Sequence, residues 1–98
     1  MKVLKVNDFA LQSYRSFVKG NRSLSSNEVA KKLTRNVLLA KKIAEIENQA
    51  WYAYGKLRIL VKDSIVTCVM NHNDIPDDWE VDLNKKKILN DMLGIARL

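Results

Sequence analysis

The stretch Ala50–His72 reads AWYAYGKLRILVKDSIVTCVMNH, and it decides the fold of the chain. It holds Trp51 and the densest run of β-branched residues, which are typical of strands. Two turn signals, Gly55-Lys56 and Asp63-Ser64, divide it, because glycine tolerates positive φ and Asp and Ser bond their own backbone in turns. The sequence therefore predicts an antiparallel meander of three strands: Ala50–Tyr54, Leu57–Lys62 and Ser64–Met70.

Alternation along the middle strand gives this sheet two unlike faces. Because successive side chains point to opposite sides, one side is apolar and the other is mixed. Apolar burial is worth about 25 cal/mol per Å², so helices must cover the apolar side. The mixed side keeps cations beside aromatic side chains and is available to a ligand. The apolar side consists of Leu57, Ile59 and Val61, and the mixed side of Arg58, Leu60 and Lys62.

The segment before the meander, residues 7–48, is predicted to be helical. Asn7 or Asp8 caps a first helix that runs to about Val18, and Gly20 ends it. The apolar side of this helix is predicted to consist of Phe9, Ala10, Tyr14, Phe17 and Val18.

A second helix begins at the capping box Ser25-Ser26-Asn27-Glu28. About twenty residues would give about 30 Å of helix, long enough to cross the sheet. The pattern leaves open a break near Arg35-Asn36. The inward stripe is Val29, Leu33, Val37, Ala40 and Ala44, widened by Leu38, Leu39, Ile43 and Ile46.

The two ends of the chain complete the predicted fold. Met1–Val6 is expected to be a short edge strand, and an acidic loop follows the meander over residues 71–82. Asp82 caps a last helix, Leu83–Leu93, which Gly94 ends and which turns Ile88, Leu89, Met92 and Leu93 to the core. The prediction is an α+β fold in one domain, 1–98: two N-terminal helices on a three- to four-stranded antiparallel meander, plus a C-terminal helix.

Charge divides the chain into unlike halves. The formal net charge is +6, and residues 1–49 carry all of it, with ten Lys or Arg against four Asp or Glu. Residues 50–98 hold seven of each and are neutral. A basic half favours polyanions such as nucleic acid, although lysines also simply keep a small protein soluble. Both interpretations stay open.

The compartment and the cofactor class follow from what the sequence lacks. It has no apolar run long enough for a signal peptide or a membrane span. Cys68 is the single cysteine, so an internal disulfide is excluded and a cytoplasmic setting is expected. One cysteine and one histidine exclude a zinc site made from these ligand types within one chain, and no cofactor or metal is predicted.

Aromatic and basic residues of the meander suggest a binding site. Tyr52, Tyr54 and Arg58 share even positions, and if the hairpin register puts them on one face they suit single-stranded RNA; otherwise a tyrosine packs under a helix. His72, directly after the third strand, is either a general acid or base or an ordinary polar surface residue. The predicted nucleic-acid-binding residues are Lys31, Lys32, Arg35, Lys42, Tyr52, Arg58 and Lys62.

From about Asn7 to His72 the chain resembles small phage and mobile-element proteins related to the barnase, colicin and RelE-type ribonuclease toxins. Three pieces carry the resemblance: DFALQSYRSF, LSSNEVAKKLTRNVL and GKLRILVKDSIVTCV. The resemblance implies a metal-independent ribonuclease fold. The first helix of that family often begins with His-Ala and has an arginine one turn later, whereas this chain has Phe9-Ala10 and Ser13. Thr67 matches the pattern, and Arg15 is a candidate replacement for the missing arginine.

These observations predict a small basic nucleic-acid-binding protein, directed to RNA and of ribonuclease-toxin ancestry, with little or no catalysis. The remaining catalytic candidates are His72 as acid or base, Tyr54 as a weaker acid and Arg58 as a phosphate clamp. The alternative is a phage-type interaction protein that binds and inhibits a host protein without chemistry.

Overall fold

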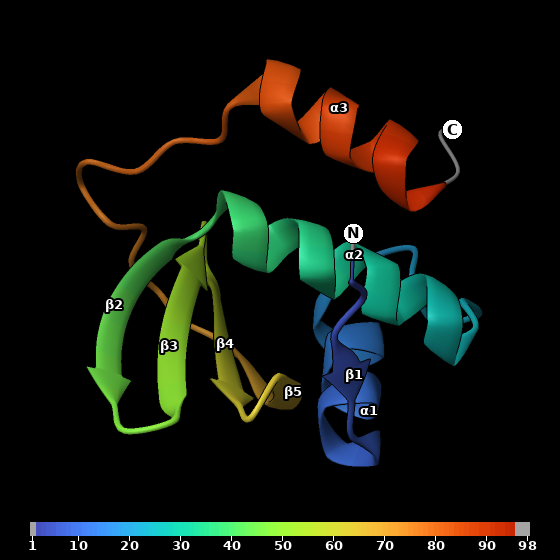
Figure 1. Ribbon diagram of the computed structural model, residues 1–98, viewed down its shortest axis with the longest axis horizontal. Coiled ribbons are helices and arrows are strands. Elements are labelled where there is room, and N and C mark those ends of the chain that lie inside the picture. Colours follow the sequence, from blue (N-terminus) through green and yellow to red (C-terminus); the bar gives the residue numbers. More distant parts are fainter. Residues whose placement is uncertain (1, 96–98) are drawn as a thin grey trace.

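The computed structural model describes residues 2–95, in which it places three helices and five strands (Figure 1). The predicted α+β class is confirmed. No helix among these residues has the length and apolar character needed to cross a membrane. In chain order the elements are β1 (Lys5–Val6), α1 (Asp8–Phe17), α2 (Ser26–Leu39), β2 (Lys41–Ile46), β3 (Gln49–Tyr54), β4 (Leu57–Lys62), β5 (Ile65–Asn71) and α3 (Leu83–Leu93).

The five strands form one sheet in the order β1-β5-β4-β3-β2. The two predicted turns are confirmed, with positive φ at Gly55 (57°), Asp63 (52°) and Ser64 (64°). The sheet has more strands than the three or four antiparallel strands that the sequence predicts. The reason is that β1 adds a parallel pair with β5, and β2 adds an antiparallel strand beyond β3. The sheet is therefore mixed. The predicted edge strand is shorter than expected, and its first residue, Met1, lies outside the described residues.

The predicted second helix is too long: α2 ends at Leu39, and the next residues form β2. At Ala40 the backbone is extended, with φ of −77° and ψ of 164°, which ends the helical hydrogen-bond series. A turn at Glu47 (φ 54°) and Asn48 then leads into β3. Pairing with β3 satisfies the backbone of β2 without a helix, so three residues predicted to face inward are exposed: Ile43, Ala44 and Ile46.

Helices α1 and α2 cover one face of the sheet, and α3 lies on α2 on the side away from the strands (Figure 1). α1 packs against β5, whereas α2 contacts β3, β1 and α3. The predicted apolar side of the middle strand is confirmed, because Val61 packs against the core and the other two residues belong to it. The core consists of Ala10, Leu11, Tyr14, Val29, Leu33, Leu57, Ile59, Val66 and Val69.

The predicted starts of the three helices are confirmed by hydrogen bonds. The Asn7 side chain accepts a backbone N–H in the first turn of α1 at 2.9 Å, and Asp82 does the same for α3 at 3.0 Å. Ser25 caps α2 at 3.2 Å, but the Glu28 carboxylate binds Lys31 rather than completing the capping box. Gly94 ends α3 in the left-handed conformation, with φ of 68°.

All three helices bury narrower stripes than the sequence predicts. On α2, Leu38 is 44% exposed, while Val29, Leu33 and Leu39 are buried. On α1, Phe9 and Phe17 are 64% and 44% exposed, and the buried residues are Ala10, Leu11 and Tyr14. On α3, Ile88 and Met92 are 57% and 61% exposed, while Leu89 and Leu93 are buried. Helix α3 makes its main described contacts with α2. Burying one side of α3 is therefore sufficient.

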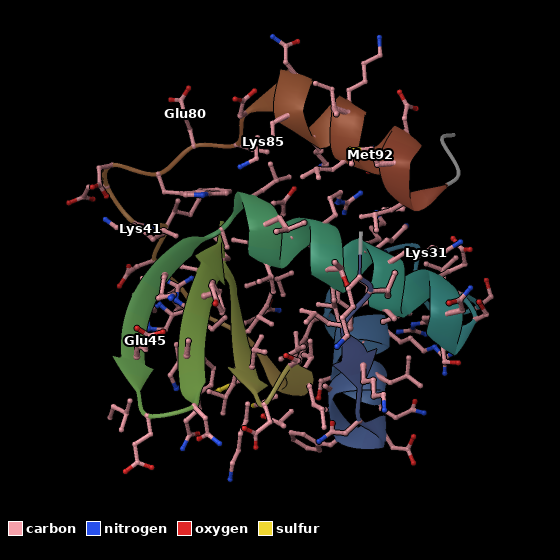
Figure 2. The ribbon with its side chains drawn as sticks, in the orientation of Figure 1. Lys31, Lys41, Glu45, Glu80, Lys85 and Met92 are labelled. Atoms are coloured by element: carbon pink, nitrogen blue, oxygen red, sulfur yellow. The ribbon has the colours of Figure 1, made fainter. Side chains whose placement is uncertain are left out.

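The acidic loop, residues 72–82, joins the strand ends to the helices. The Trp79 ring meets Tyr54 edge-on at 5.3 Å, and its Nε1 donates to the Leu39 carbonyl. Asp78 forms an ion pair with Lys41. Glu80 points away from the strands (Figure 2). The loop thus closes one end of the sheet, and the helices of the described residues leave the second sheet face uncovered.

Candidate functional site

The strand register defines a covered face and an open face of the sheet. Tyr52, Ile59 and Val69 form one cross-strand row on the covered face, under the helices. The neighbouring row, Trp51, Leu60 and Cys68, points the other way. We call this second side the open face; by the register it carries Lys5, Lys41, Ala44, Ile46, Gln49, Trp51, Ala53, Arg58, Leu60, Lys62, Ile65, Cys68 and Met70, and Ile43 borders it at the bulge of β2.

The register separates the predicted tyrosines from the predicted arginine. Tyr52 pairs with Ile59 and Tyr54 pairs with Leu57, both on the covered face. Arg58 pairs with Ala53 on the open face. The three residues therefore do not form one stacking platform, and the alternative, tyrosines packed under helices, holds for both.

Each tyrosine has a lysine over its ring. The Lys42 Nζ lies 5.9 Å from the centre of the Tyr52 ring, and the Lys86 Nζ lies 5.7 Å from that of Tyr54. These distances are within the range of a cation–π contact. The tyrosine faces are therefore occupied by the protein's own side chains.

Arg58 and His72 do come together, in a hollow of about 240 Å³ on the open face. The guanidinium of Arg58 donates to the carbonyls of Gly55 (2.9 Å), Leu57 (3.2 Å) and Asp74 (2.6 Å). It thus ties the β3–β4 turn to the acidic loop. The other residues that line the hollow are Ile43, Trp51, Met70 and Asn71.

His72 is oriented by its own backbone neighbours. Its amide donates to the Lys56 carbonyl at 2.7 Å, and its Nδ1 accepts from the Asp74 amide at 3.2 Å. An accepting Nδ1 leaves the proton of the neutral ring on Nε2, which can donate to a ligand. Of the three predicted catalytic residues, His72 and Arg58 share the hollow, whereas Tyr54 lies on the other face.

The predicted basic residues of α2 are largely engaged inside the protein. Arg35 is buried, and its Nε and Nη2 donate to the Asn36 side-chain oxygen at 3.1 and 3.0 Å, while its Nη1 donates to Asn90 at 3.0 Å. The Lys32 Nζ donates to Asn21 at 2.9 Å, and burial, followed by the charge of Arg35, lowers the pKa of Lys32. These two cations are better placed to hold the helices together than to meet a ligand.

Two further predicted cations form ion pairs. Lys31 binds Glu28 at 3.2 Å, and Lys42 binds Glu45 at 2.9 Å. Lys62 differs, because it is exposed on the open face at the end of β4. Of the predicted nucleic-acid-binding residues, Arg58 and Lys62 are therefore the ones that the structure places on a shared, uncovered surface.

Sequence reasoning missed two residues of the open face, Trp51 and Lys5. Trp51 is half-buried between Ala44 and Leu60, near the middle of the face. Lys5 lies beside Ile65 on β1, at the opposite edge of the sheet. The alternation that puts Arg58 and Lys62 on the same face of β4 was visible in the sequence. Placing Trp51 beside them requires the β3–β4 register.

The charges of the open face have one sign. In the strands that the structure describes, the carboxylate residue is Glu45, whose register with Ala50 puts it on the covered face. The strand cations of the open face are Lys5, Lys41, Arg58 and Lys62, of which Lys41 is paired with Asp78 of the acidic loop. The face is therefore apolar and cationic around Trp51.

Metal ligands are not gathered at this surface. Between residues 2 and 95, no group of three or more His, Cys, Asp or Glu side chains is arranged to hold a metal ion. Cys68 lies on the open face, where burial raises the pKa of its thiol. A raised pKa favours the protonated thiol over the nucleophilic thiolate.

Comparison with known proteins gives one family. The family model described as YorE matches residues 4–92. The SPbeta prophage-derived uncharacterized protein YorE of Bacillus subtilis (strain 168) is 31% identical over 104 residues, which cover 97% of this chain and 85% of that protein. No solved structure matches the chain. The resemblance to ribonuclease toxins thus stays a prediction.

Proposed function

Because this chain belongs to the YorE family, we propose that it serves in a phage setting as a small protein that binds single-stranded RNA on the open face of its sheet. The prophage origin of the Bacillus subtilis relative supports the setting. The binding surface differs from the tyrosine-based one that the sequence favours, and its centre is Trp51.

The observation that carries this proposal is the combination of one aromatic ring with charges of one sign. Single strands are held by bases stacked on aromatic side chains and by cations along the backbone. Trp51 supplies the ring, and Lys5 and Lys62 supply cations on the same face. The carboxylate of Glu45 is turned to the other side, where Lys42 neutralises it.

The hollow beside Trp51 is the proposed place for a base. Its volume is about 240 Å³, and it offers an indole wall, the apolar Met70 and the polar edge of His72. Because His72 Nε2 carries the proton of the neutral ring, it can donate to an acceptor on the base. The acidic loop borders this end, so the strand would leave toward Lys62 and Lys5.

Fluorescence anisotropy of a labelled single-stranded RNA tests the proposal. Lys62→Ala and Lys5→Ala should each lower the affinity and reduce the slope of log K against log salt by about 0.7. Trp51→Ala should weaken binding by about 1–3 kcal/mol, and Trp51→Phe, which keeps a ring, by much less. Lys19→Ala and Phe9→Ala are matched controls, because both side chains are exposed and lie away from the open face.

If the wild-type protein shows no affinity at about 50 mM salt, or if Lys19→Ala costs as much as Lys62→Ala, the open face is not an RNA site. Far-UV circular dichroism of each variant separates a lost fold from a lost contact.

A second function, docking on a host protein, is favoured by one observation. Ile43, Ile46 and Met70, which belong to or border the open face, are 46%, 71% and 48% exposed. Apolar surface of this kind is typical of protein interfaces. Capture from a bacterial lysate with and without nuclease separates the two functions, because a protein partner that survives nuclease and is lost in Met70→Lys supports docking.

A further inference from the structure

Within residues 2–95, no strand pairs with the outer side of β2, which is therefore a sheet edge. β2 is last in the strand order, its neighbour is β3, and residues 42–48 are all exposed. An edge strand of this kind presents a row of backbone N–H and C=O groups to another strand. Figure 1 shows β2 at the edge of the sheet, with the acidic loop beside its first residues and no described strand along its outer side.

The charge pattern along this edge is asymmetric. Lys41 and Lys42 stand at its start, whereas Glu45 and Glu47 stand near its end and in the turn that follows. Figure 2 shows Lys41 and Glu45 well apart along the strand. A strand that is basic at one end and acidic at the other complements an antiparallel copy of itself.

We infer that two copies of this chain form a symmetric dimer by antiparallel pairing of β2 with β2. The register that satisfies the charges puts Lys42 of each copy opposite Glu45 of the other. Both side chains lie on the covered face, since Lys42 pairs with Tyr52 and Glu45 with Ala50. The same register sets Lys41 opposite Ile46, and both of these lie on the open face. Faces and charges therefore agree in one register.

The ion pair within one copy supports this geometry. The Lys42 Nζ and the Glu45 Oε2 are 2.9 Å apart across the bulge between Lys42 and Ala44. Both side chains thus lie on the same side of the same edge. On dimerisation, each would exchange its partner within one copy for the equivalent side chain of the other copy. Parallel pairing would instead put lysine beside lysine and glutamate beside glutamate, which is unfavourable.

The assembly stops at two copies. An antiparallel pair of identical strands has a two-fold axis and is closed. The other edge of the sheet is β1, which has two residues and is too short to add a further copy. Because β2 has six residues, the interface is below the standard size, and we expect a dissociation constant on the order of micromolar.

The pairing would join two sheets into one and set two open faces side by side. It involves only protein groups, so it does not depend on the binding of RNA. Sedimentation equilibrium of the purified chain, from low to high micromolar concentration, measures it directly. The expected result is a reversible monomer–dimer equilibrium without nucleic acid.

Charge reversal tests the register. Lys42→Glu and Glu45→Lys should each weaken the dimer about tenfold or more, because two cross-strand pairs become repulsive. An equimolar mixture of the two variants should associate again. In the mixed dimer, positions 42 and 45 are both acidic in one copy and both basic in the other, so each cross-strand pair is attractive. Lys19→Glu, an exposed change of the same charge elsewhere, should leave the dimer unchanged.

The mixture keeps the test valid if one variant is merely less stable. A chain that stays monomeric throughout overturns the inference, as does a dimer that neither single variant weakens. Weakened single variants whose mixture fails to associate would show that the edge pairs in another register.

Discussion

The indole Nε1 of Trp79 donates a hydrogen bond of 2.9 Å to the backbone oxygen of Leu39, the last residue of α2. The last carbonyls of a helix lack helical partners, so this bond satisfies one of them and fixes the acidic loop to the helix. The same ring meets Tyr54 edge-on at 5.3 Å. One side chain therefore joins the loop, the helix end and β3.

Two substitutions separate the hydrogen bond from the ring contact. Trp79→Phe keeps a ring but loses the donor, and should lower the free energy of unfolding by about 1 kcal/mol. Trp79→Ala loses both and should cost about 3 kcal/mol. Urea denaturation measures both values. The exposed neighbouring residue, Glu80, serves as a control: Glu80→Ala should change the free energy of unfolding by less than about 0.5 kcal/mol. Equal stability of Trp79→Phe and the wild type would contradict this role.

The second prediction concerns the contribution of the buried Arg35 guanidinium to stability. Its described hydrogen-bond acceptors are amide oxygens, and Asn36, which is 2% exposed, accepts from two of its nitrogens. Asn36→Ala leaves two nitrogens of a buried cation without their acceptor and should lower the free energy of unfolding by about 3 kcal/mol. Arg35→Met removes the cation and should lower it by about 1 kcal/mol or less. In the Arg35→Met background, Asn36→Ala should lose more than half of its effect. Additive costs in this double-mutant cycle would show that the two side chains act independently.

Alkaline pH gives a third prediction through Tyr14. Burial raises the pKa of this phenol above 10.0, against the smaller opposing effects of the Arg35 charge and the Asn36 hydrogen bond. Above pH 10 the unfolded chain loses a proton that the folded chain retains, so the free energy of unfolding falls as pH rises. Below that pH both states are neutral at this group, and it contributes no pH dependence.

Tyr14→Phe should therefore make the loss of stability above pH 10 less steep. Urea denaturation on both sides of that pH measures the slope. The difference in phenolate absorbance between wild type and variant reports Tyr14 directly, and a midpoint at or below 10.0 would contradict the buried environment.

Local signals in the sequence account for the parts of the fold that were predicted. The meander from β3 to β5 follows from turn residues at Gly55 and Asp63 and from β-branched strands, and the helix starts follow from Asn7, Ser25 and Asp82. β2 was missed because its apolar residues, Ile43 and Ile46, have a spacing that also fits a helix. The turn after β2 begins at Glu47, and glutamate rarely adopts a positive φ, so the sequence gives no turn signal there.

The site depends more on long-range contacts, and less of it could be predicted. The alternation in β4 put Arg58 and Lys62 together without any structure. Choosing Trp51 rather than Tyr52 as their aromatic neighbour requires the β3–β4 register. The burial of Arg35 depends on how α3 packs on α2, which no local pattern encodes.

Ribonuclease activity is the last prediction, and the expected result is that there is none. Metal-free RNA cleavage needs a base for the 2′-hydroxyl, an acid for the leaving oxygen and cations for the phosphate. His72 can supply one acid–base group, but Tyr54 is on the opposite face of the sheet, and Arg58 is already bonded to three carbonyls. A single general acid–base group contributes about 10²–10⁴-fold, too little for rapid turnover alone. Incubation of the purified protein with total RNA, beside His72→Ala, measures this. Any true trace of cleavage should vanish in His72→Ala, and rapid cleavage that survives that substitution would mean that the catalytic groups lie outside the hollow.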